Sequence, residues 1–477
     1  MADTTLSPPE TTRRSMRPVL TLSTCMRRLS TGRGASFRRL RLHGLAPLPP
    51  RLRAEFEKGE RMTALDSGAR VWAGLAVTPS SELMFIVGVL LAGALAGEFI
   101  AATTRLPRVV GYTLAGCFAA AFGHGVALPL NGAAQTVTDL ALGLLLFEIG
   151  SRVHLRWLRR NPGLLATSVA EALLSAVAVA FVLRLFDVSW QTAIACAILA
   201  MPAPAAVSGR VALELGAQGQ VTQRATMLTA LNTLYAVIAL TLMRTWWAAD
   251  DGGSLPQALA GLAISLLTTL GVAALLAGAV YLAARRLDLR NGSAALLLFG
   301  LVAFAIVAAR AIGVSTLLMP LLAGLLLRNT SDRPWVWPRH FGTSGGALVL
   351  MLFVIVGSAW SPSVLVAGGF VALALMAARF FAKALAIVAL APAAKSSWRQ
   401  GLSLAITMTP LSGTALVMLS ELMRAEPELV AGAVPIVLAS IAVLELIGPI
   451  AVQFALRLAG ELPPAPTRRQ RKKEVGP

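Results

Sequence analysis

The sequence has few of the residues on which soluble enzymes and disulfide-stabilised proteins depend. Charged residues make up only 14% of the 477 residues, and there are three cysteines and four histidines. Cys117 and Cys196 lie inside apolar segments and the histidines are scattered singly, so neither a disulfide framework nor a Cys/His metal site is indicated. The sequence also has no Gly-Lys-Ser/Thr phosphate loop and no paired metal ligands. We therefore expect no enzyme activity, no cofactor and no resident metal ion.

Long apolar segments dominate the chain instead. Hydrophobic residues make up 56% of it, the mean hydropathy is +0.72, and thirteen segments are long and apolar enough to cross a lipid bilayer. A net charge of +19 would suggest a nucleic-acid partner in a soluble protein, but here the charges lie between the apolar segments. The sequence therefore predicts an all-α polytopic membrane protein of about thirteen transmembrane helices, which contacts the lipid bilayer and no nucleic acid.

The charges of the connecting segments predict the orientation. Lys and Arg residues that flank crossings stay mostly on the cytoplasmic side. Sixteen of them fall on one side of the thirteen crossings and four on the other. The basic tail, residues 459–477, falls on the side of the sixteen. We therefore expect a cytoplasmic C-terminus in a bacterial inner membrane, with the first helix entering from outside.

The N-terminal arm, residues 1–82, conflicts with this orientation because it holds fourteen Lys/Arg residues against seven Asp/Glu residues. Its Pro-, Arg- and Ser-rich composition predicts disorder. Translation that begins at Met62 or Met84, translocation of the arm despite its charge, or a further crossing near Val71 would each resolve the conflict. The last is the weakest explanation, because the apolar run there is far too short.

Ionisable residues inside the predicted crossings mark candidate sites, because a charge is costly to bury in a bilayer. Arg379 and Lys383 are spaced i, i+4 in the eleventh crossing, so both cations share one helix face near the middle of the membrane. Glu171 in the fourth crossing and Glu445 in the last lie at comparable depth and are the candidate partners. Glu148 lies near the cytoplasmic end of the third crossing, where its side chain can also reach water.

Proline and glycine interrupt two crossings, the fifth and the twelfth, which indicates unwound helices around a transport site. Because they are seven crossings apart, they run in opposite directions, as an inverted repeat of residues 83–243 and 293–456 about a linker helix at 256–284 requires. Proline kinks without function are the alternative. The unwound backbone and nearby hydroxyls could hold ions, and the residues concerned are Pro202, Pro204, Ser208, Thr409, Pro410, Ser412 and Gly413.

Five short stretches carry a family resemblance. They are Arg-Leu-Pro-Arg-Val-Val-Gly-Tyr at 105–112, Leu-Leu-Leu-Phe-Glu-Ile-Gly at 144–150, Val-Ala-Leu-Glu-Leu-Gly at 211–216, Gly-Val-Ser at 313–315 and Gly-Pro at 448–449. In their order and spacing, the transmembrane region 83–458 resembles the monovalent cation:proton antiporter superfamily, in particular its bacterial group related to glutathione-gated potassium efflux proteins and sodium:proton exchangers. The resemblance implies two inverted six-helix units, a core domain with crossed, broken helices, and a scaffold domain that forms a homodimer.

The resemblance also implies a binding site on the sixth helix. Relatives usually carry an Asn-Asp or Asp-Asp pair there, beside a cation on the eleventh helix. The matching residues here are Asn232 and Thr233, so the usual carboxylate is absent. Because Thr233 cannot titrate, proton exchange would depend on another of the ionisable residues named above. Glu171 and Lys383 are favoured, since both lie deep in helices that the resemblance places in the core domain.

Three functions are consistent with these residues. The first is secondary active transport, in which a monovalent cation (Na⁺ or K⁺) is exchanged for protons by alternating access. The second is a non-coupled or regulated ion pathway, or a receptor-like protein, and the missing carboxylate favours it. The third is transport of an organic anion, because a site with cations and no paired acid could attract one.

Overall fold

The structure is a computed structural model that describes residues 79–463, apart from residues 124, 204, 251–254, 287–291, 331–340, 361 and 412. The described helices belong to one compact unit. The predictions made for the arm up to residue 78 and for the tail from residue 464 lie outside the described residues. Those made for Pro204 and Ser412 also lie outside them.

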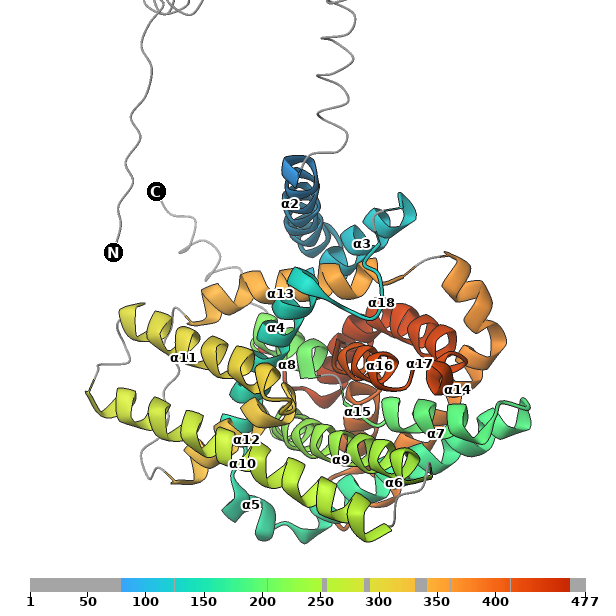
Figure 1. The fold of residues 1–477 in the computed structure, drawn as a ribbon. Coiled ribbons are helices and arrows are strands. Elements are labelled where there is room, and N and C mark those ends of the chain that lie inside the picture. Colours follow the sequence, from blue (N-terminus) through green and yellow to red (C-terminus); the bar gives the residue numbers. More distant parts are fainter. Residues whose placement is uncertain are drawn as a thin grey trace, which may run out of the picture. The chain divides into compact units, whose positions relative to one another are not determined.

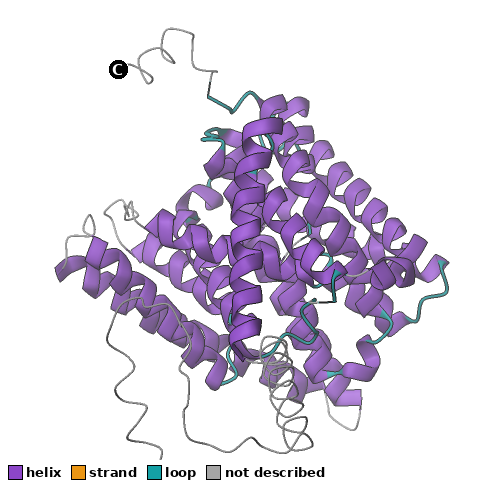
Figure 2. Ribbon diagram, turned by 90° about the horizontal axis from the view of Figure 1, so that it is seen from above, coloured by secondary structure: helices purple, strands orange, loops and turns teal. Residues whose placement is uncertain are grey.

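The described residues form seventeen helices joined by loops, and none of them forms a strand (Figure 2). The helices are α2 (Pro79–Thr104), α3 (Arg108–Ala121), α4 (Gly132–Arg152), α5 (Leu155–Arg159), α6 (Pro162–Leu185), α7 (Trp190–Leu199), α8 (Ala205–Glu214), α9 (Gln220–Asp250), α10 (Leu255–Arg286), α11 (Gly292–Ala311), α12 (Leu318–Thr330), α13 (Phe341–Ser358), α14 (Pro362–Ala389), α15 (Trp398–Thr407), α16 (Gly413–Ala425), α17 (Pro427–Val430) and α18 (Ala433–Ala459).

Each predicted crossing coincides with one of these helices or with a pair of them, so the prediction of an all-α polytopic membrane protein is confirmed. Seven helices among the described residues are long and apolar enough to cross a membrane alone: α2, α4, α6, α9, α10, α14 and α18. The predicted fifth and twelfth crossings are each split in two, into α7 with α8 and α15 with α16. The short helix α5, on the predicted cytoplasmic side, has too few residues to show a periodic pattern in the sequence.

Local chemistry explains where the split crossings begin and break. The hydroxyl of Ser189 accepts the amide of Thr192 in the first turn of α7, and Ser397 forms a reciprocal capping box with Gln400 at the start of α15. Proline lacks an amide hydrogen and its ring disfavours a helical residue before it. Accordingly, α7 ends three residues before Pro202, and α15 ends three residues before Pro410.

The long helices pack as two groups (Figure 1). The core group consists of α6, α7, α8, α9, α14, α15, α16 and α18, and the scaffold group of α2, α3, α4, α11, α12 and α13; α10 packs against both α9 and α12. Within the scaffold group α3 pairs with α13 and α4 pairs with α12. In the two predicted repeats, α3 corresponds to α12 and α4 corresponds to α13. The α3–α13 pairing in one order is therefore the α12–α4 pairing in the other, as an inverted repeat requires.

Glycine allows the paired scaffold helices to approach closely. A Cβ atom at Gly116 would lie 2.2 Å from the Val354 carbonyl oxygen, and one at Gly150 would lie 2.2 Å from that of Leu321. Small residues at such contacts let membrane helices pack backbone against backbone. The α3–α13 and α4–α12 pairs are therefore in close backbone contact at these glycines.

Candidate functional site

Arg379 lies where the two split crossings meet, and its guanidinium is bound entirely by backbone carbonyls. It projects from α14 beyond a kink at Gly369 and is 1% exposed. Its Nε donates to the Ala200 oxygen at 2.7 Å, and Nη2 donates to Pro202 at 3.0 Å. The carbonyls of Met408, Thr409 and Pro410 accept the remaining hydrogen bonds, with Nη2 at 3.3 Å from Met408 and 3.1 Å from Pro410.

This arrangement compensates two helix ends with one cation. The carbonyls that follow the last turns of α7 and α15 have no helical partner, and the C-terminal end of a helix carries partial negative charge. We predicted Glu171 or Glu445 as the carboxylate partner of Arg379 or Lys383. The structure shows instead that Arg379 is bound by carbonyls of the two broken segments. The planar fork of its five N–H groups suits a ring of separate acceptors better than it suits one carboxylate.

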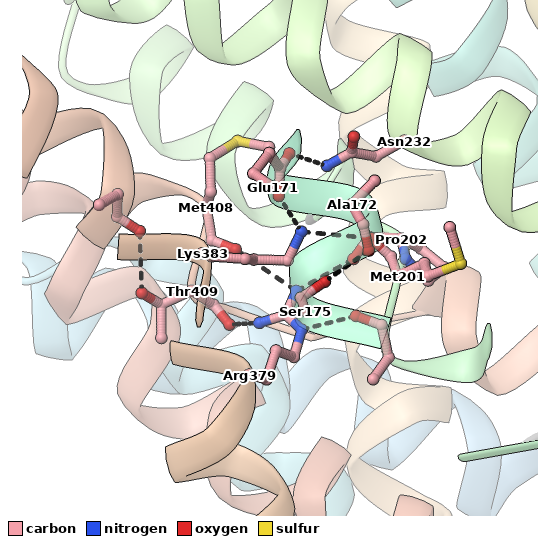
Figure 3. Close-up of polar contacts among 12 residues, drawn as sticks. Glu171, Ala172, Ser175, Met201, Pro202, Asn232, Arg379, Lys383, Met408 and Thr409 are labelled. Carbon is pink, nitrogen blue, oxygen red and sulfur yellow. Dashed lines mark hydrogen bonds and ion pairs between the residues drawn. The ribbon is translucent and has the colours of Figure 1, made fainter. Parts of the chain in front are cut away.

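Lys383, one turn further along α14, has the carboxylate partner. Its Nζ forms an ion pair with Glu171 Oε2 and lies 3.4 Å from the Met201 carbonyl oxygen. The other carboxylate oxygen accepts a hydrogen bond from Asn232 Nδ2 (Figure 3). All three side chains are at most 1% exposed. The structure therefore joins three predicted site residues, from α6, α9 and α14, in one buried cluster, which we name the central cluster.

The α9 face beside the central cluster offers free oxygen atoms. Thr233 is buried, and its hydroxyl donates to the Thr229 carbonyl at 2.9 Å. Asn232 Oδ1 and Thr229 Oγ1 are buried and have no hydrogen-bond partner among the described residues. Unpaired buried oxygens next to a carboxylate are suited to a dehydrated monovalent cation, because hard cations prefer oxygen ligands.

Other predicted residues lie apart from the central cluster. Glu148 forms an ion pair with Arg152 one turn away at the end of α4, and its side chain is 21% exposed. Glu445 on α18 is 1% exposed and forms neither a hydrogen bond nor an ion pair with any described residue. Ser208 lies on α8 beside a small cavity, and Gly413 begins α16.

A cavity lies at each end of the boundary between the core and scaffold groups, which we name the seam. The cavity at the predicted cytoplasmic end has a volume of about 50 Å³ and is lined by Arg152 of α4 and residues of α8, α9, α15 and α18. The cavity at the opposite end is about 200 Å³. Its lining includes five charged residues, Asp139, Arg244, Arg310, Glu421 and Arg424. Of these two cavities, the one at the end predicted to face outside is therefore the larger.

Contacts between the two groups close the cytoplasmic end. Both oxygens of Glu214, the last residue of α8, accept the backbone amide of Arg108 at the start of α3, at 2.9 and 3.2 Å. Gln453 of α18 donates to the Arg105 carbonyl at 2.8 Å. Within the core group, Glu461 holds the first turn of α9 by accepting the Thr222 amide at 2.9 Å.

We did not predict these roles for Glu214, Gln453 and Glu461. Glu214 and Glu461 lie at a helix end or just beyond one, where a polar residue is ordinary, and Gln453 lies in the last two turns of α18. The sequence signal was indirect for Glu214: it falls in the stretch 211–216 and its partner in 105–112, two of the stretches that carry the family resemblance.

Comparisons with known proteins agree with this fold. The family model described as sodium/hydrogen exchanger, transmembrane, matches residues 86–458. Two solved structures of the sodium proton antiporter MjNhaP1 from Methanocaldococcus jannaschii share the fold. One, at pH 8, gives a TM-score of 0.56 at 16% identity and covers 80% of this chain and 99% of that chain. The other, an electron-microscopy map, gives 0.59 at 16% identity and covers 82% and 100%.

Among curated proteins no match was found. The family match spans most of the chain, and the chain therefore belongs to the sodium/hydrogen exchanger family. The predicted resemblance to monovalent cation:proton antiporters is confirmed. The chain is a multi-pass membrane protein with the antiporter fold.

Proposed function

We propose that the protein exchanges a monovalent cation, Na⁺ or K⁺, for protons across the bacterial inner membrane. The core group would move against the scaffold group to give alternating access to the central cluster. As the family resemblance implies, the scaffold groups of two chains would form a homodimer. Family membership supports the exchange. The observation that carries the proposal is the buried Glu171 carboxylate, which Lys383 and Asn232 share beside the two broken crossings.

The central cluster can couple the two ions by competition. A dehydrated cation needs the negative charge of Glu171 and the free oxygens of Asn232 and Thr229. The Lys383 ammonium holds that carboxylate in the structure. A cation that takes its place leaves the ammonium without a counter-charge, so Lys383 releases a proton to the same side. Proton return to Lys383 restores the ion pair and expels the cation. One cation then replaces one proton.

Proton movement in proteoliposomes tests the proposal. Purified protein is reconstituted with an internal pH dye, and sodium, potassium or lithium salt is added outside. We expect cation-dependent alkalinisation or acidification that disappears in Glu171→Gln and in Lys383→Ala. The exposed Glu428→Gln is the matched control and should behave like the unaltered chain. If the internal pH stays unchanged with every cation, and the protein is shown to be folded, exchange would be rejected.

A non-coupled pathway is the second candidate, and the absence of a carboxylate at Thr233 favours it. In that case cation flux would continue without proton movement. The Thr233→Asp variant separates the two candidates, because it supplies the carboxylate that relatives carry beside Asn232. If exchange works through Glu171 and is limited by the missing acid, Thr233→Asp should raise proton-coupled flux. If the unaltered protein conducts cations without protons, tracer flux will be independent of the imposed pH gradient.

A further inference from the structure

Glu445 is a buried carboxyl group that the proposed exchange does not use. It lies in the middle of α18, is 1% exposed, and its Oε2 has no hydrogen-bond partner among the described residues. It forms no ion pair with any of them either. This contrasts with Glu171, whose two oxygens are both engaged. An ionised carboxylate without a partner is costly to bury, so the group is a neutral carboxylic acid in this arrangement.

The position of Glu445 places this acid in the seam. One turn further along α18, a Cβ atom at Gly448 would lie 2.7 Å from Cβ of Pro410, so this helix face packs on the break of the twelfth crossing. Scaffold helix α3 packs against α18, and among the described residues the titratable side chain close enough to Glu445 for an electrostatic interaction is the Cys117 thiol of that helix. Two turns beyond Glu445, Gln453 contacts the Arg105 carbonyl in front of the same helix. Core and scaffold therefore meet around Glu445.

We propose that Glu445 is a second proton-binding site, whose proton must be in place before the core group can pack against the scaffold as it does here. This inference rests on the proposed movement of the core group. When that movement opens the seam at α3, water reaches the carboxyl and the proton can leave. An ionised Glu445 then has no ion-pair partner among the described residues and resists closure. The rate of transport would therefore fall as the pH rises.

Cation-for-cation exchange isolates this requirement, because it moves no net proton through Lys383. Proteoliposomes are loaded with sodium salt, tracer sodium is added outside, and the pH is equal on both sides and raised in steps. On the alkaline side we expect tracer exchange by the unaltered protein to fall by roughly tenfold for each pH unit, as the protonated fraction of one group does. Glu445→Gln, which is permanently neutral, should hold its rate across the same range. Glu445→Asp should keep the fall, and Glu428→Gln should match the unaltered protein.

Each result decides a separate point. Parallel profiles for the unaltered protein and Glu445→Gln, or a flat profile for both, would overturn the role of Glu445 and leave exchange standing. Absence of tracer exchange at every pH would instead reject the proposed function. Infrared difference spectra give a readout that does not require transport. The carbonyl band of a protonated carboxylic acid should be present in the unaltered protein and shift in Glu445→Asp. An unshifted spectrum would contradict a protonated Glu445 even if Glu445→Gln failed to fold.

Discussion

The Glu171–Lys383 and Glu148–Arg152 ion pairs join the same kinds of group in different surroundings. The side chains of Glu171 and Lys383 are 0% and 1% exposed, whereas those of Glu148 and Arg152 are 21% and 45% exposed. Removing one partner of a buried pair leaves a charge that water cannot solvate, whereas an exposed charge simply becomes hydrated. The comparison shows that the burial of an ion pair, more than the pairing itself, determines how strongly the stability of this fold depends on it.

The buried charges differ from the exposed pair in a second way: they join α14 to segments far away in the sequence. Arg379 and Lys383 occupy successive turns of α14, and their donors are taken up by separate acceptors, carbonyls for one and a carboxylate for the other. The exposed pair at the end of α4 links only residues of its own helix. The effects of substitutions should therefore decrease from Arg379 and its carbonyl acceptors outward to the exposed Glu148–Arg152 pair.

The largest effect is expected for Arg379→Ala. Five carbonyl oxygens lose their donor in a region closed to water, and each unsatisfied buried acceptor costs about 1–3 kcal/mol. The total loss is on the order of 5 kcal/mol or more, enough to prevent stable folding. Thermal unfolding in detergent, followed by size-exclusion chromatography, measures it. Arg379→Lys should recover only part of the loss, because an ammonium has no fork. Full stability of Arg379→Lys would show that charge alone holds the two breaks.

The next largest effect is expected for the central ion pair. Glu171→Gln and Lys383→Met should each lower the free energy of unfolding by about 3–5 kcal/mol, since each leaves the other partner buried and uncompensated. The double variant removes both charges and should cost clearly less than the sum of the two. A double-mutant cycle on unfolding midpoints measures this coupling. Additive losses would mean that the two side chains do not depend on one another.

How far the sequence could predict the two breaks, Arg379 and the central cluster depends on the kind of sequence pattern that marks each of them. Pro202 and Pro410 predicted both breaks, because proline acts on its own backbone. The i, i+4 spacing predicted that Arg379 and Lys383 share a helix face. The choice of partner was not predictable. Glu171 and Glu445 lie at similar depth in apolar helices that both pack against α14. Only the contacts of each side chain distinguish the paired carboxylate from the unpaired one.

A smaller effect is expected at the cytoplasmic end of the seam, for Glu214→Gln. The carboxylate caps α3 from another helix, and loss of such a cap costs about 0.5–2 kcal/mol. Because the contact joins core to scaffold, its loss should also open the small cytoplasmic cavity. Ala212→Cys places a thiol in that cavity, and its labelling by a polar maleimide should accelerate when Glu214→Gln is added. Glu98→Gln removes an Arg108 partner within the scaffold group and should leave labelling unchanged. Equal labelling rates for Ala212→Cys alone, with Glu214→Gln and with Glu98→Gln would show that Glu214 does not hold the seam closed.

The smallest effect is expected for Glu148→Gln, which provides the exposed side of the comparison. An exposed i, i+4 ion pair contributes about 0.3–0.5 kcal/mol, so the unfolding midpoint should hardly move. Exchange should also persist, because Glu148 is separated from the central cluster and Arg152 remains hydrated without it. The same proteoliposome assay and unfolding measurement used for Glu171→Gln give a direct contrast between two identical substitutions. If Glu148→Gln instead abolished exchange while leaving stability unchanged, the proton path would run through the end of α4, and the central cluster would be a structural ion pair.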